Sequence, residues 1–152
     1  MMLASGNEFI KEFAERTKHV YEDTKKGDYE VTALINCMVG LLIVPKERLF
    51  DKIDNAILGN EKVAELKKCV KANSYHQTLD LKFICRHLRN AVAHSNFEFK
   101  AEKPVIIGNP LIINSVVFED HDDFGHSCDI EMNTDQLENF LYAFTDAILK
   151  VI

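Results

Sequence analysis

Several features are missing from this sequence, and each absence excludes a class of protein. No apolar run is long enough to cross a membrane, because the longest one, residues 35–44, contains Asn36 and ends before Pro45. The N-terminal stretch MMLASGNEFIKEF lacks the basic segment and long apolar core of a secretory signal. We therefore expect a cytoplasmic protein with no membrane partner.

Paired cysteines are also missing. The cysteines stand at positions 37, 69, 85 and 128, and no two of them have the short spacing of a zinc site. Reduced thiols in a cytoplasmic protein explain this pattern better than a disulfide framework does. The sequence predicts no metal site built on cysteine and no cofactor.

An excess of basic residues is absent as well. The formal net charge is −6, which does not favour broad, nonspecific binding to nucleic acid. The charge is unevenly distributed, however, because residues 61–103 hold nine of the eighteen lysines and arginines and residues 104–149 hold none. A small basic site in the middle of the chain is compatible with this distribution.

The bulk composition is that of a globular protein. Hydrophobic residues make up 47% of the 152 residues and charged residues 28%. The sequence contains no repeat, low-complexity segment or linker. We therefore expect one domain, residues 1–152.

Helical periodicity dominates the first two thirds of the chain. Apolar residues recur at three- and four-residue spacing, and capping residues or glycines bound the segments. The helices predicted from these patterns are residues 5–25, 29–44, 61–72 and 77–95, with a short amphipathic piece after Pro45 and a last helix capped by Asn133 or Thr134.

Strand patterns are confined to residues 96–131. Phe97 and Phe99 alternate with polar residues, and VIIGNPLIINSVVF places two β-branched runs around a Gly-Asn-Pro turn. The predicted fold is mainly α: an antiparallel bundle of about five helices, with a small antiparallel hairpin or sheet inserted before the C-terminal helix.

The segment CRHLRNAVAH in the helix predicted at 77–95 has an unusual polar face. On a helical wheel, one side is apolar and packs into the bundle. The other side carries, without any carboxylate between Leu81 and Asn96, the residues Arg86, Arg89, Asn90, Ala93 and His94. His87 joins Asn90 and His94 in a stripe with Phe83.

These residue types suit a phosphate and a proton transfer. Arginine offers a planar fork of donors, histidine takes and gives a proton near neutral pH, and asparagine can orient either partner. The chemistry that fits is metal-independent cleavage of RNA, with the 2′-hydroxyl as nucleophile, His94 as general base or acid and Arg89 stabilising the phosphorane charge. Arg86 and His87 are predicted to contact the substrate. A two-fold dimer would supply a second histidine.

A simpler interpretation stays open. Arginine and histidine near the C-terminus of a helix complement its dipole without any further function. In another alternative, Arg89 and His94 belong to a non-catalytic module that binds a nucleotide, RNA or a protein.

The segment RHLRNAVAH resembles the signature of the HEPN superfamily. Arg89, Asn90 and His94 match its order, an arginine, a polar residue and then a histidine. The stretch ALINCMVGLLIVPKE, residues 33–47, is similar to the second helix of a bacterial subgroup of small stand-alone HEPN proteins.

The resemblance implies an antiparallel helical bundle and a homodimer with both motifs at the interface. It also implies metal-independent ribonuclease activity in a toxin–antitoxin, phage-defence or stress role, with an antitoxin protein as a possible partner. HEPN toxins that pair with a nucleotidyltransferase often carry a tyrosine two residues after the histidine, where this sequence has Asn96. That difference argues against control by a nucleotidyltransferase.

Further residues outside this motif carry weaker expectations. The segment EDHDDFGH, residues 119–126, has the oxygen and nitrogen ligands of a metal site but equally suits a surface loop. Asn36 is expected to form a hydrogen bond within the core. Tyr75 and His76 precede the motif helix and are placed either at its start or at the mouth of a cleft. Phe83, Arg86, Ala93 and the second helix are the expected dimer contacts.

Overall fold

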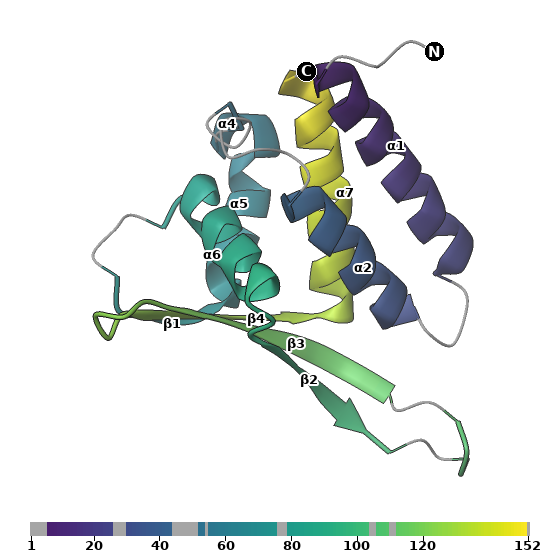
Figure 1. Ribbon diagram of the computed structural model, residues 1–152, viewed down its shortest axis with the longest axis vertical. Coiled ribbons are helices and arrows are strands. Elements are labelled where there is room, and N and C mark those ends of the chain that lie inside the picture. The colour runs from purple at the N-terminus through teal and green to yellow at the C-terminus, as the bar shows by residue number, and fades with distance from the viewer. Residues whose placement is uncertain are drawn as a thin grey trace.

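The structure is a computed structural model that describes residues 6–25, 30–43, 52–53, 55–75, 79–103, 106–109 and 112–151. The helices stand on one face of a single antiparallel sheet (Figure 1). Among the described residues, no helix combines the length and apolar character needed to cross a membrane.

The helices largely follow the predicted periodicity. In chain order they are α1 (Gly6–Thr24), α2 (Glu30–Ile43), α4 (Asn55–Leu58), α5 (Asn60–Cys69), α6 (Leu81–Ala93) and α7 (Thr134–Val151). The first, second and last predicted helices are confirmed within a few residues. Asn133 caps α7 as predicted, because its Oδ1 accepts from the backbone N–H of Gln136 while Gln136 Oε1 accepts from the N–H of Asn133.

The predicted small hairpin or inserted sheet is wrong. Four strands form the sheet, in the order β1-β4-β3-β2, with β1 (Val70–Asn73), β2 (Phe97–Glu102), β3 (Ile112–His121) and β4 (Ser127–Asn133). The first strand comes between α5 and α6 in the chain, so the sheet as a whole is not an insertion before the last helix. The mainly α class remains, with a larger sheet than expected.

β1 was hidden in the helix predicted over residues 61–72. That helix ends at Cys69, and the next residues, VKAN, pair with β4. Lysine and alanine are good helix formers, and β1 has only a few residues, so local propensity gives the wrong answer. The pairing with Ile130 and Cys128, about sixty residues away, overrides it.

The predicted Gly-Asn-Pro turn falls in the connection between β2 and β3. Gly108 has a φ of +97°, a left-handed conformation that favours glycine, and Asn109 N–H donates to the carbonyl of Ile106. Ile106 and Ile107 of the first β-branched run therefore belong to this connection and not to a strand. Pro110 lies outside the described residues.

α6 lies between the other helices and the sheet, which is what positions the candidate site. It contacts α2 and α5 on one side and β3 on the other. It therefore buries two adjacent sides: Leu81, Ile84, Cys85, Leu88, Ala91 and Val92 as predicted, and also Phe83 and His87. The single apolar face predicted for this helix is too narrow, because the sheet covers a second side.

The opposite face of the sheet is not covered by the described helices. On β3, Val116, Phe118 and Asp120 are buried, while the alternating residues Val117 and Glu119 point away. All four cysteines are free and buried, in agreement with the prediction of reduced thiols.

Candidate functional site

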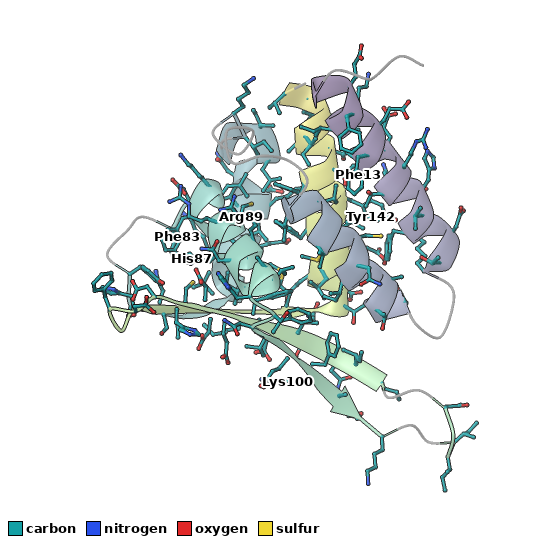
Figure 2. All side chains as sticks on the ribbon, in the orientation of Figure 1. Phe13, Phe83, His87, Arg89, Lys100 and Tyr142 are labelled. Atoms are coloured by element: carbon teal, nitrogen blue, oxygen red, sulfur yellow. The ribbon has the colours of Figure 1, made fainter. Side chains whose placement is uncertain are left out.

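The polar face of α6 remains accessible next to the residues that the sheet covers. Arg86, Arg89 and Asn90 are half-buried, and Ala93 and His94 are exposed. Arg89 lies about 200° around the helix from His87, so the two side chains leave α6 on opposite sides. Figure 2 shows both side chains on this helix. The predicted motif residues are thus on the surface, and the predicted substrate contact His87 is not.

The end of α6 fixes the backbone of His94. Ser95 adopts a left-handed conformation with φ of +56°, and its N–H donates to the carbonyl of Val92. Asn96 N–H donates to the carbonyl of Ala91 at 2.7 Å, which completes a Schellman motif with His94 at the helix C-cap. The helix therefore ends at Ala93, and His94 caps it immediately before the chain turns back at Ser95.

The sheet holds this helix end in place. The carbonyl of Asn96 accepts from the backbone N–H of Glu119 on β3 at 2.9 Å. A serine in the left-handed region costs about 1 kcal/mol relative to glycine. Two constraints, the turn and the bond to β3, thus keep His94 close to the sheet.

A buried carboxylate connects β3 to the same helix. Asp120 Oδ2 lies 2.5 Å from His87 Nδ1 and accepts from Asn90 Nδ2 at 3.2 Å. Asp120 is 7% exposed and His87 4% exposed, so this contact is shielded from solvent. Asn90, one of the predicted catalytic residues, is therefore connected to two buried side chains: it bonds directly to Asp120 and is linked through Asp120 to His87.

Aromatic rings surround His87. Its ring centroid lies 4.0 Å from that of Phe83 and 4.7 Å from that of Tyr75. The Nε2 atom of His87 is buried and has no hydrogen-bond partner among the described residues. Both the rings and Asp120 therefore restrict the orientation of this imidazole.

Tyr75 lies between the interior and the turn that joins β3 to β4. Its ring centroid is 5.4 Å from that of His126. Burial raises the pKa of Tyr75 above its ordinary value, and the charges of Asp120 and Asp122 raise it further. Tyr75 thus follows β1 and borders the buried cluster, while His76 lies outside the described residues.

The acidic segment 119–126 is divided between the core and the surface. Asp120 points into the interior, whereas Asp122 Oδ2 pairs with His126 Nδ1 at 2.9 Å in the turn. Within the described residues, no group of three or more histidines, cysteines and carboxylates is arranged to hold a metal ion. Two of the four carboxylates of this segment, those of Asp120 and Asp122, therefore belong to two separate pairs.

Sequence reasoning missed Asp120, although the signal was present. Val116, Phe118 and Asp120 alternate along β3, which places all three on the same face of the strand. The acidic run that follows made residues 119–126 look like a surface loop. The alternation rule would have placed Asp120 with the core.

Two other expectations are wrong. Asn36 is exposed on α2 instead of bonded within the core, because the side of α2 that carries it faces a shallow apolar groove between α1 and α2. Phe83 is 5% exposed, so it is not available as a dimer contact. Arg86 and Ala93 remain accessible to a partner.

Comparisons with curated proteins and with solved structures give no match. A family model does match, over residues 1–152, and it is described as HEPN pEK499 p136. The match includes the α6 motif and the sheet that supports it. The chain therefore belongs to the HEPN pEK499 p136 family.

Proposed function

We propose that this protein is a metal-independent endoribonuclease whose site is formed by Arg89, Asn90 and His94. The observation that carries the proposal is the surface at the end of α6. It presents an arginine, an amide and an imidazole without a carboxylate on the helix, and two backbone constraints hold its histidine. HEPN domains are often ribonucleases, so membership of the family supports the same activity.

The proposed reaction uses the substrate's own 2′-hydroxyl as nucleophile. The 2′-oxygen attacks the adjacent phosphorus while its proton moves to the imidazole of His94, and the 5′-oxygen leaves with a proton from a second acid. The products are a 2′,3′-cyclic phosphate and a 5′-hydroxyl. Arg89 stabilises the negative charge that develops on the phosphorane oxygens.

The second acid is proposed to be His94 of a second copy. One imidazole cannot be base and acid at the same moment, and a two-fold dimer through the accessible face of α6 would bring two of them into one cleft. Arg86 is proposed to contact the substrate phosphates beside Arg89. Because the ring of His87 is buried, we propose that His87 affects the site indirectly, through its contact with Asp120.

The uncovered face of the sheet is unsuited to RNA, which supports the α6 side as the binding surface. Glu98 on β2, Val117 on β3 and Glu131 on β4 are in register across this face, and Glu119 and Asp129 form the neighbouring row. Lys100 lies on the same face and pairs with Glu131 at 2.5 Å (Figure 2). Carboxylates on this surface repel a phosphate backbone.

The direct test is cleavage of RNA in EDTA. We expect the wild type to produce a 2′,3′-cyclic phosphate and to leave uncut an RNA with a 2′-deoxy substitution at the scissile position. His94→Ala should lower the rate by about 10²–10⁴-fold and still bind RNA. Arg89→Ala should weaken both binding and cleavage, because its charge holds the ground state as well as the transition state.

The chain offers controls for both substitutions. His19→Ala and Arg16→Ala remove the same side-chain types from the exposed surface of α1, and neither should change cleavage. Binding of RNA without cleavage by the wild type would indicate a non-catalytic module. Cleavage that EDTA abolishes, or cutting of the deoxy-substituted RNA, would show that the mechanism is wrong.

The biological role is proposed to be that of a toxin in a toxin–antitoxin pair or of a phage-defence or stress nuclease. Expression of the wild type in a bacterium should then slow growth, and expression of His94→Ala should not. An antitoxin protein would protect the cells. Equal growth with both proteins would contradict a toxic role.

A further inference from the structure

The contact that suggests a further residue for this site lies beneath the motif, between α6 and β3. His87 and Asn90 are three residues apart on α6, so their side chains leave the helix on neighbouring positions of one side. Both reach the same oxygen of Asp120, His87 Nδ1 at 2.5 Å and Asn90 Nδ2 at 3.2 Å. One carboxylate oxygen on the sheet thus fixes two side chains of the helix.

The chemistry of a carboxylate decides how the amide of Asn90 is turned. An ionised carboxylate only accepts hydrogen bonds, so the NH₂ group of Asn90 must face Asp120. The carbonyl oxygen, Oδ1, then faces away from Asp120. By the same rule His87 presents a protonated Nδ1 to Asp120.

We propose that Asp120 is a positioning residue that turns the Asn90 amide so that Oδ1 is offered to the substrate as a hydrogen-bond acceptor. This inference rests on the proposed ribonuclease function. A nucleotide offers one donor beside the scissile phosphate, the 2′-hydroxyl. Asn90 Oδ1 accepts from that hydroxyl in the bound substrate and holds the attacking oxygen in place, and the O–H then turns to the imidazole of His94, which takes its one proton.

Asp120 suits this role because several independent contacts fix its own position. It is 7% exposed on β3, and its backbone is in register with Cys128 on the neighbouring strand. His87 also bonds to the shared oxygen, and its ring packs against those of Phe83 and Tyr75. Asn90 therefore receives its orientation from the sheet and not from its own helix.

Exchanging the two side chains provides the sharpest test. Asn90→Asp places a carboxylate against Asp120, and like charges at this distance repel. In the double variant Asn90→Asp/Asp120→Asn, the new amide at position 120 donates to the new carboxylate at position 90, which still offers an outward oxygen. His87 can accept from that amide by changing its neutral tautomer.

The expected result concerns the turnover number of RNA cleavage. Asn90→Asp should lower kcat by about 10²-fold, the cost of a misplaced reacting group, and the exchanged double variant should recover at least about 10-fold of this loss. Both variants carry the same outward charge, so their KM values should agree within about 2-fold. Asp120→Asn alone keeps an acceptor oxygen and should lose less activity than Asp120→Val.

Two measurements keep the outcomes separate. If the wild type cleaves RNA and all variants are folded by circular dichroism, a double variant no better than Asn90→Asp overturns the positioning role and leaves the proposed function standing. If the wild type does not cleave RNA, the proposed function fails. In that case the hydrogen bond between Asn90 and Asp120 is tested by measuring the exchange of the Asn90 side-chain amide protons by NMR. Slow exchange that Asp120→Asn or Asp120→Val accelerates supports the hydrogen bond, and unchanged exchange overturns it.

Discussion

Tyr75 contacts the histidine of each of two histidine–aspartate pairs in the described part of the chain, and the pairs differ in both sequence separation and burial. His87 and Asp120 are 33 residues apart, on α6 and β3, and both are buried. His126 and Asp122 are four residues apart, in one turn, and their side chains are 39% and 31% exposed. The same two residue types therefore occur in a tertiary contact and in a local one.

The local pair is organised by the backbone around it. The N–H groups of Phe124 and His126 both donate to Asp122 Oδ1, so the turn would hold this carboxylate even without the imidazole. The buried pair has no such local support, because Asp120 meets His87 only when α6 packs on β3. The buried pair therefore forms only in the folded protein. Its loss should lower the free energy of unfolding more than loss of the local pair does.

The largest effect is expected from removing the buried carboxylate. Asp120→Val leaves His87 Nδ1 without a partner in the interior, and breaking a buried pair from one side costs about 3 kcal/mol of unfolding free energy. Urea denaturation measures this loss. The matched control, Asp122→Val, removes an exposed carboxylate and should lower stability less. A larger loss for the control would mean that burial does not distinguish the two pairs.

Removing both buried partners should restore stability without restoring function. His87→Leu/Asp120→Val replaces the pair by apolar side chains, which suit a helix face and a strand and leave no unpaired imidazole in the interior. Its unfolding free energy should exceed that of Asp120→Val, while its RNA cleavage stays low because Asn90 has lost its acceptor. Recovery of cleavage together with stability would show that the pair serves the fold alone.

How much of this could be read from the sequence depends on the range of each interaction. α1, α2 and α7 were predictable because a helix is specified by residues three and four apart. Arg89, Asn90 and His94 could be proposed as site residues for the same reason, since they lie within one segment of one helix. β1 and the complete sheet were not predictable, because VKAN becomes a strand only through pairing with β4.

The buried residues next to the candidate site could not be predicted without knowing that the sheet, as well as the other helices, packs on α6. A helical wheel assumes one core-facing side, and α6 has two because helices and sheet pack on it from different directions. Phe83 and His87 were therefore placed on the surface in error. Asp120 was recognisable from the alternation with Val116 and Phe118, but its partner was not, because no local pattern joins residues 87 and 120.

The exposed pair is expected to affect stability in a pH-dependent way. Burial alone would raise the pKa of Asp122, but hydrogen bonds from His126 and Phe124 hold it below its ordinary value of 3.8. A carboxyl whose folded pKa is lowered contributes stability above its unfolded pKa and loses that contribution as the pH falls through the folded pKa. The stability difference between wild type and Asp122→Asn should therefore be present at neutral pH and shrink below 3.8. A difference that grows in acid, measured by urea denaturation, would contradict the assignment.

The smallest expected effect uses Tyr75 as a reporter of both carboxylates at once. Burial is the main reason that its pKa lies above 10.0, the charge of Asp120 comes next, and the charge of Asp122 follows. Asp120→Asn should therefore lower the pKa of Tyr75 more than Asp122→Asn does, because each substitution removes one charge that disfavours the phenolate. Neither should bring the pKa down to 10.0, since burial of the ring remains. NMR titration of the tyrosine ¹³Cζ resonances, with Tyr75→Phe identifying the signal, measures both shifts. An equal or larger shift in Asp122→Asn would show that the exposed pair, and not the buried one, dominates the field at this ring.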